Sequence, residues 1–207
     1  MVNHLIVIID YGMGNLRSVL HKVKKLGIDS IISSNKEDIL GADKLILPGV
    51  GSFAVGIENL KNYKLVDILN KKVLIEKTPI LGICLGMQLF TKKSEEGNVE
   101  GLGWIDAETK RFTFTNKNLK IPHVGWNSII LKKKSILFND IKPDTYFYFT
   151  HSYHVCCKNE KDVLCTTNYG YDFVSAINKE NIYGTQFHPE KSHKIGMKII
   201  QNFAEFG

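Results

Sequence analysis

The 207-residue chain contains no apolar run of the roughly eighteen residues that a membrane-spanning helix requires. Residues 1–10 carry no basic stretch and end in an aspartate, which is typical of a buried first strand and not of a signal peptide. Only four cysteines occur, without a Cys-x-x-Cys pair or histidines at metal-ligand spacing. These absences argue against a membrane protein, a disulfide scaffold and a metal site, and they favour reduced thiols in the cytoplasm.

Acidic residues are in the minority, since 27 Lys and Arg face 21 Asp and Glu for a net charge of +6. The lysines are scattered among carboxylates, however, and no stripe of basic residues is interleaved with aromatic ones. This distribution predicts a solvated surface and no nucleic-acid partner. A basic docking face for a partner subunit remains open.

Internal repeats, low-complexity tracts and linkers are also missing, so residues 1–207 are expected to form one domain. The first half alternates strand and helix patterns, which favours an α/β fold: an open, mostly parallel sheet with flanking helices. From about Arg111, short β-rich runs indicate antiparallel strands attached to one end of that sheet. The expected strands include 5–10, 28–32, 44–47, 79–83, 111–114 and 182–186, and the expected helices include 16–26, 63–75 and 193–206.

Cys84 stands between Gly82 and Gly86, at the end of an apolar strand and just before a helical segment. A strand, a Gly-x-nucleophile-x-Gly turn and a helix form the pattern of a nucleophile elbow. The partial positive charge of a helix N-terminus favours the thiolate, which is the nucleophilic form of cysteine. A buried core cysteine that happens to lie between glycines is the alternative, and this motif alone does not decide between them.

A cysteine nucleophile needs a base, and the base needs an orienting group. His188 and Glu190 lie two residues apart around Pro189, so the carboxylate can reach the far nitrogen of the imidazole. An isolated histidine is more often an ordinary core or surface residue. The elbow cysteine upstream makes a catalytic His188 the better interpretation.

An acyl-transfer site also needs donors for the oxyanion. Gly49, Val50 and Gly51 follow an expected strand in a glycine-rich turn whose backbone N–H groups can approach a ligand closely. The N–H of Leu85, directly after the nucleophile, is the second expected donor. A phosphate-binding loop is the competing interpretation, but the turn lacks the Gly-Lys-Ser/Thr ending of a P-loop.

Together these residues resemble a class I, triad-type glutamine amidotransferase with a flavodoxin-like sheet. Further stretches resemble the glutaminase subunit of imidazole glycerol phosphate synthase, and the similarity runs from Ile9 to Phe203. The stretches that carry it are 10–18, 48–53, 82–88, 122–127, 151–153, 169–170 and 186–192.

The resemblance implies hydrolysis of L-glutamine to glutamate and ammonia through a glutamyl thioester on Cys84. His188 would protonate the departing ammonia and then activate water, while Glu190 would hold the ring. No cofactor and no metal is implied. Four further residues match substrate-holding positions of the family: Gln88, Glu96, Ser152 and Tyr153. For Glu96, a solvated loop carboxylate is the alternative.

The resemblance also implies a heterodimer, in which ammonia passes to a (β/α)₈ cyclase subunit. That partner makes imidazole glycerol phosphate and an aminoimidazole carboxamide ribotide in histidine biosynthesis. Weak glutaminase activity is expected for the isolated chain, because in enzymes of this kind docking can switch the oxyanion turn. The residues matched to the docking edge are Asn15, Arg17, Ser18, Trp126 and Asn127, with an ordinary core aromatic as the alternative for Trp126.

Three rival functions stay open. A paralogous glutaminase subunit could feed ammonia to another synthase, such as a cell-surface sugar amidotransferase, and would keep all these motifs. A cysteine peptidase or amidase on a similar sheet shares the elbow but has no need of Gln88. A non-catalytic interaction subunit is the third, and the intact set of Cys84, His188 and Glu190 speaks against it.

Overall fold

The computed structural model describes residues 4–116 and 118–206, so the expectations for residues 1–3 lie outside it. Five parallel strands form the centre of a twisted sheet, in the order β2-β1-β3-β4-β14. Most of their residues are buried on both faces, as the continuous apolar runs of the sequence require. These strands are β1 (Ile6–Ile9), β2 (Ser30–Ser33), β3 (Lys44–Gly49), β4 (Ile80–Cys84) and β14 (Ile182–Thr185).

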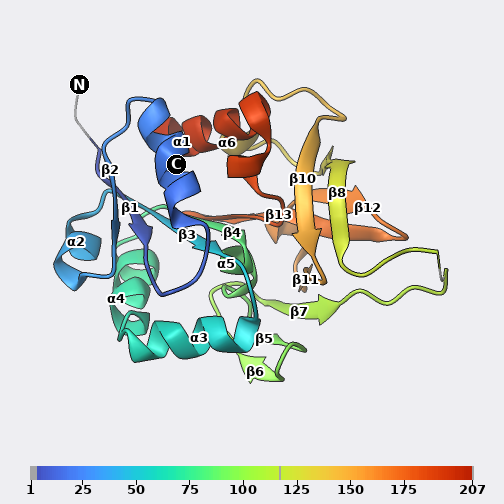
Figure 1. Cartoon of the computed structure of the whole chain (residues 1–207), viewed down its shortest axis with the longest axis horizontal. Helices are drawn as coiled ribbons and strands as arrows, with labels where there is room; N and C mark the ends of the chain where they lie inside the picture. The colour runs from blue at the N-terminus through green and yellow to red at the C-terminus, as the bar shows by residue number, and fades with distance from the viewer. Residues whose placement is uncertain (1–3, 117, 207) are drawn as a thin grey trace.

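Helices cover both faces of this sheet. Side chains along β1 alternate, so that Ile6 and Ile8 pack with α1 and α6, whereas Val7 and Ile9 pack with α3 and α4. Figure 1 shows the two helix pairs on opposite sides of the sheet. The helices are α1 (Leu16–Lys25), α2 (Lys36–Gly41), α3 (Phe53–Asn62), α4 (Val66–Asn70), a π-helical segment (Lys71–Ile75), α5 (Leu85–Gln88) and α6 (His193–Phe206). None of them has the length and apolar character to cross a membrane in the described part of the chain.

Antiparallel strands extend the sheet beyond β14, through β13, β11 and β7. A separate two-stranded ribbon, β8 with β10, lies beside them (Figure 1). The remaining strands and short 3₁₀ helices are β5 (Lys93–Ser94), β6 (Val99–Glu100), β7 (Ala107–Arg111), β8 (His123–Ser128), β9 (Ile130–Leu131), β10 (Tyr146–His151), β11 (Tyr153–Cys157), β12 (Val163–Asn168), β13 (Asp172–Lys179), Ile136–Phe138, Glu160–Asp162 and Pro189–Lys191.

The α/β architecture expected from the sequence is confirmed, and two local expectations were wrong. Of the strand expected at 111–114, only Arg111 is in a strand, as the last residue of β7, which begins at Ala107. The sequence pattern predicts an antiparallel strand at 182–186, but β14 pairs antiparallel with β13 and parallel with β4. Burial between two neighbours gives such a strand the same apolar pattern whichever way those neighbours run.

Helix α3 was not predicted from the sequence. Phe53, Ile57 and Leu60 recur at helical spacing and are buried, but a glycine-rich turn directly before them hid the start of the helix. Part of its N-terminal capping comes from a distant residue, since the backbone N–H of Phe53 donates to Glu96 Oε2 at 2.7 Å. Long-range capping of this kind leaves no local signature.

Candidate active site

Cys84 ends β4 in a backbone conformation that few non-glycine residues adopt, with φ 55° and ψ −109°. Both flanking glycines are required by close approach. A Cβ on Gly82 would lie 2.6 Å from the Phe90 ring, and one on Gly86 would lie 1.8 Å from the Leu47 carbonyl oxygen. The chain therefore makes the sharp strand-to-helix turn of a nucleophile elbow, where backbone strain commonly marks function.

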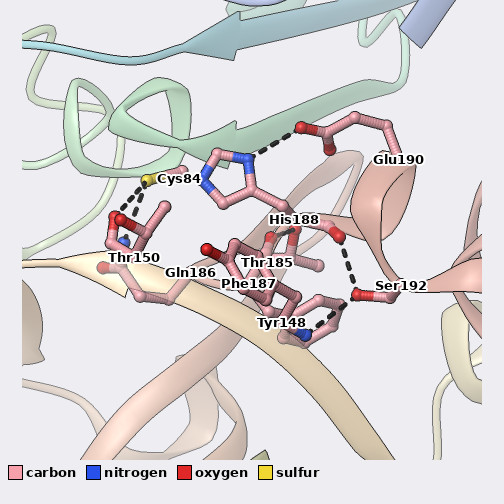
Figure 2. Close-up of polar contacts among 9 residues, drawn as sticks. All are labelled: Cys84, Tyr148, Thr150, Thr185, Gln186, Phe187, His188, Glu190 and Ser192. Atoms are coloured by element: carbon pink, nitrogen blue, oxygen red, sulfur yellow. Dashed lines mark hydrogen bonds and ion pairs between the residues drawn. The ribbon is translucent and has the colours of Figure 1, made fainter. Parts of the chain in front are cut away.

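The imidazole of His188 lies between the sulfur of Cys84 and the carboxylate of Glu190 (Figure 2). Its Nδ1 is 2.8 Å from Glu190 Oε1, and both side chains are almost wholly buried. Its other nitrogen, Nε2, has no partner with hydrogen-bond geometry and faces the Cys84 sulfur. Three side chains from two distant segments thus lie in line, in the order that a nucleophile, a base and an orienting carboxylate require.

The backbone of His188 is fastened to β10, which fixes where the ring can go. Its N–H donates to the Tyr148 carbonyl at 2.9 Å. The hydroxyl of Ser192 donates to the His188 carbonyl at 2.7 Å and accepts from the Tyr148 N–H at 3.0 Å, as Figure 2 shows. This bridge positions the base relative to the sheet.

The charges beside His188 decide its protonation. Burial by itself lowers the pKa of the imidazole, but the Cys84 thiolate and the Glu190 carboxylate outweigh it and raise the pKa from 6.5 to about 10. The raised pKa favours the imidazolium form of His188 at neutral pH. Such a group can donate a proton to a leaving amine.

Two residues that contact the Cys84 sulfur were not among the predicted site residues. The side-chain amide of Gln186 donates to Cys84 Sγ at 3.6 Å, and the Thr150 carbonyl lies 4.0 Å from the same atom (Figure 2). Gln186 could have been found, because it precedes His188 by two residues at the end of β14, where alternate side chains share a face. Thr150 contacts the sulfur through its backbone carbonyl oxygen, so its residue type could not have indicated the contact.

The predicted oxyanion turn lies directly beside the nucleophile. Gly49 pairs with Cys84 in the β3–β4 register, and a Cβ on Gly49 would lie 2.4 Å from the Tyr11 hydroxyl and 2.8 Å from the Leu85 Cβ. Gly51 has φ 111°, a conformation that favours glycine. Val50 between them is exposed. The backbone of this turn is therefore close to the sulfur and open to a ligand.

A cavity of about 310 Å³ opens at Cys84, and most of the predicted substrate and oxyanion residues line it. They come from the β3 turn, α5, the loop after β5 and the β10–β11 junction. The lining comprises Val50, Gly51, Cys84, Leu85, Gln88, Glu96, Pro122, Thr150, His151, Ser152 and Tyr153. Gly49, the last residue of β3 before the turn, does not line the cavity.

Gln88 and Glu96 have further bonds within the protein. The Gln88 amide donates to the Tyr153 carbonyl at 2.9 Å and to Gln186 Oε1 at 3.0 Å. Glu96 keeps one carboxylate oxygen on the α3 N-terminus, as described above, while it lines the cavity. Glu96 is therefore not simply a solvated loop carboxylate.

The five residues matched to a docking edge are at least partly accessible. Asn15 and Arg17 are exposed at the start of α1, with Ser18 half-buried beside them. Asn15 precedes the helix without a side-chain capping bond. Trp126 is 45% exposed and stacks on His193 with ring centroids 5.1 Å apart, so the core alternative for this residue is wrong. Asn127 is half-buried and donates to the Asn168 carbonyl at 2.9 Å.

Across residues 4–116 and 118–206, His, Cys, Asp and Glu side chains form no group of three that could hold a metal ion. All four cysteines are free thiols.

Comparison of the whole chain with known proteins identifies its family. The family model "Glutamine amidotransferase class-I" matches residues 7–205. Among solved structures, a glutamine amidotransferase (20% identity, TM-score 0.73, 96% of this chain and 97% of that one) and PurLQS from Thermotoga maritima (17% identity, TM-score 0.73, 99% of each) share the fold.

Curated relatives are much closer in sequence. Imidazole glycerol phosphate synthase subunit HisH 2 of Methanococcus maripaludis is 55% identical over 96% of this chain and 98% of its own length. Subunit HisH 1 of the same organism is 48% identical over 97% and 99%, and HisH 2 of Pseudomonas aeruginosa is 45% identical over 97% and 99%. The chain therefore belongs to the class-I glutamine amidotransferases and, within them, to the HisH glutaminase subunits of imidazole glycerol phosphate synthase.

Proposed function

We propose that this subunit hydrolyses L-glutamine through a triad of Cys84, His188 and Glu190. The observation that carries the proposal is the position of the His188 ring, between the cysteine sulfur and the buried Glu190 carboxylate (Figure 2). The adjoining cavity has room for a small amino acid and is lined by the sulfur itself. The role of this subunit in histidine biosynthesis follows from its membership of the HisH family.

The chemistry has two halves. The Cys84 thiolate attacks the side-chain amide carbon of glutamine, a C–S bond forms, and the C–N bond breaks as the imidazolium of His188 protonates the departing ammonia. Water then attacks the thioester and gives a proton to the now neutral His188. The C–S bond breaks, glutamate leaves, and the thiolate–imidazolium pair is restored.

The remaining cavity residues have roles that fit their geometry. We assign the oxyanion contacts to backbone N–H groups of the Gly49–Gly51 turn and of Leu85. The turn pairs with Cys84 in the β3–β4 register, and Leu85 lines the cavity beside the sulfur. The residues that hold the substrate are Gln88, Glu96, Ser152 and Tyr153. All four line the cavity.

As a HisH subunit the chain works with a cyclase subunit. We assign that partner a (β/α)₈ fold and place it against Asn15, Arg17, Ser18, Trp126 and Asn127, whose accessible positions support this edge. Ammonia must pass directly to the partner, because in water at neutral pH it becomes ammonium and loses its nucleophilic lone pair. We also propose that the chain is one domain that works in the cytoplasm, which its free thiols support.

The proposal is tested by glutamate release from glutamine, with and without the cyclase subunit. We expect weak activity for the chain alone, stimulation by the partner, and near-complete loss in Cys84→Ala. Cys156→Ala, at a half-buried cysteine outside the cavity, serves as the matched control and should keep the native rate. Full activity of Cys84→Ala would overturn the triad.

A second candidate acceptor has a specific observation in its favour. Methanococcus maripaludis has two numbered HisH proteins, and this chain is similar to both. A paralogue of this kind could pass its ammonia to a different synthase, such as a cell-surface sugar amidotransferase, with the same glutaminase chemistry. Co-purification and activation by one of the two candidate synthases would distinguish the pathways.

A further inference from the structure

Two buried histidines that the proposed mechanism does not use lie behind the cavity. His123 begins β8 and His151 ends β10, and the two residues are paired in the antiparallel register of that ribbon. Both side chains are buried, and only His151 reaches the cavity lining. His123 is stacked between Phe149 and Tyr169, with centroids 5.0 and 4.0 Å away, so aromatic rings shield it from water.

Their hydrogen bonds determine which nitrogens carry protons. His151 Nδ1 lies 2.8 Å from the Tyr153 carbonyl, which can only accept, so this nitrogen carries the hydrogen. Burial lowers the pKa of His123 to about 4 and that of His151 well below 6.5, so both rings are neutral. The other nitrogen of His151 then accepts from His123 Nδ1 at 3.2 Å. His123 Nε2 in turn accepts from the Asn127 amide at 3.4 Å.

The same chain of bonds continues to the nucleophile. The Tyr153 carbonyl accepts from the Gln88 amide as well as from His151. The second N–H of that amide donates to Gln186, whose own amide donates to Cys84 Sγ. Every donor in the series has a matching acceptor, from Asn127 at the surface to the sulfur.

We propose that His123 and His151 are positioning residues for glutamine hydrolysis: as a pair of neutral Nδ1–H tautomers they hold the Tyr153 carbonyl, which orients Gln88, Gln186 and so the Cys84 sulfur. The inference rests on the proposed function for its kinetic consequence only. It also gives Asn127, at the proposed docking edge, a connected route to the nucleophile. Networks whose donors and acceptors are all satisfied orient their members more firmly than isolated bonds do.

A measurement on the native chain tests the tautomers without any mutation. Nitrogen-15 NMR of labelled histidines distinguishes a protonated from an unprotonated ring nitrogen, and free neutral histidine in water favours the Nε2–H form. We expect both His123 and His151 to carry the proton on Nδ1 at neutral pH. Protonation of Nε2 in either ring would overturn the proposal, whatever the enzyme's activity.

The effect of this positioning on glutamine hydrolysis is tested by measuring kcat/KM with the cyclase subunit present. His151→Gln places its amide near the position of Nε2 and loses the donor to Tyr153, so kcat/KM should fall by about 100-fold, as for a small misplacement of reacting groups. His151→Asn keeps a donor near Nδ1 and should restore most of the activity. His154→Gln is the matched control. The His154 ring lies in the same aromatic cluster, with its centroid 4.7 Å from that of Phe112. Its Nε2 is hydrogen-bonded to the Tyr171 hydroxyl, so this ring has no bond to the residues that line the cavity.

Equal kcat/KM for His151→Gln and His154→Gln, at equal melting temperatures, would refute the positioning role. A native complex that releases no glutamate would instead refute the proposed function and leave the tautomer measurement standing as the test of this inference.

Discussion

Gly86 packs against Leu47 so closely that a Cβ on the glycine would lie 1.8 Å from the leucine carbonyl oxygen. The contact joins the turn after Cys84 to β3, the strand that leads into the oxyanion turn. The sulfur and its expected oxyanion donors are therefore held in place by backbone contact, which side-chain motion cannot loosen.

Replacement of Gly86 tests this contact. Gly86→Ala forces α5 and β3 apart. The change should lower the free energy of unfolding by about 1–3 kcal/mol, as overpacking does, and it should displace Cys84. Thermal melting and glutamate release measure the two effects. Gly41→Ala is the control, because a Cβ at that helical position meets no atom within 4 Å. Similar melting of the two variants would contradict the prediction.

The protonation of His188 can be followed by NMR. Its raised pKa, about 10, means that the bound proton stabilises the fold fully below pH 6.5 and that this contribution is lost as the pH rises through about 10. Glu190→Gln and Cys84→Ala each remove one charge that raises the pKa, so the His188 titration midpoint should fall in both. Glu205→Gln, on the exposed end of α6, should leave it unchanged. An unaltered midpoint in Glu190→Gln would show that the pair is not coupled.

Lys44 stabilises the far end of the sheet, away from the proposed chemistry. Its buried ammonium donates to the carbonyls of Phe203 and Ala204 at 3.1 and 2.8 Å, which satisfies the C-terminal end of α6. Lys44→Met should lower the free energy of unfolding by about 1–3 kcal/mol, because two buried acceptors lose their donor. Lys25→Met, at an exposed lysine that ends α1, should change it little. Denaturant titration of both variants decides, and equal losses would contradict the assignment.

We predict that Trp126 anchors the cyclase subunit at the proposed docking edge. It is 45% exposed beside Val124, which is 55% exposed, and large aromatic residues dominate binding energy at interfaces. Trp126→Ala should weaken association by about tenfold or more in a titration followed by calorimetry. Ile75→Ala, which removes a 76% exposed side chain at the end of the π-helical segment, is the control. Unchanged affinity in Trp126→Ala would exclude this edge.

The local chemistry of the site could be read from short motifs. Gly82 and Gly86 specify a tight turn around Cys84, because a Cβ at either glycine would clash with Phe90 or with Leu47. His188 and Glu190 are two residues apart and meet through one short bond. Helix α6 begins and ends where its apolar periodicity predicted. Each of these features depends on neighbours in the chain.

Several features that depend on distant partners were not predicted. Helix α3 has part of its cap supplied by Glu96, and β14 takes a parallel neighbour from a strand some hundred positions earlier. The contact between Gln186 and Cys84, and the bonds from His151 to Tyr153, likewise arise only when β4, β14 and β10 come together.

The amino-acid sequence by itself determined the residue types of the site and the turns that present them, because glycine sterics and helical or strand periodicity act over a few residues. Tertiary structure alone decided which nitrogen faces the sulfur, that the Gln186 amide contacts the sulfur, and that Pro122, Thr150 and His151 join the cavity lining. Those outcomes depend on burial and on hydrogen bonds between segments far apart in the chain, and the energies of such contacts exist only after the sheet has formed.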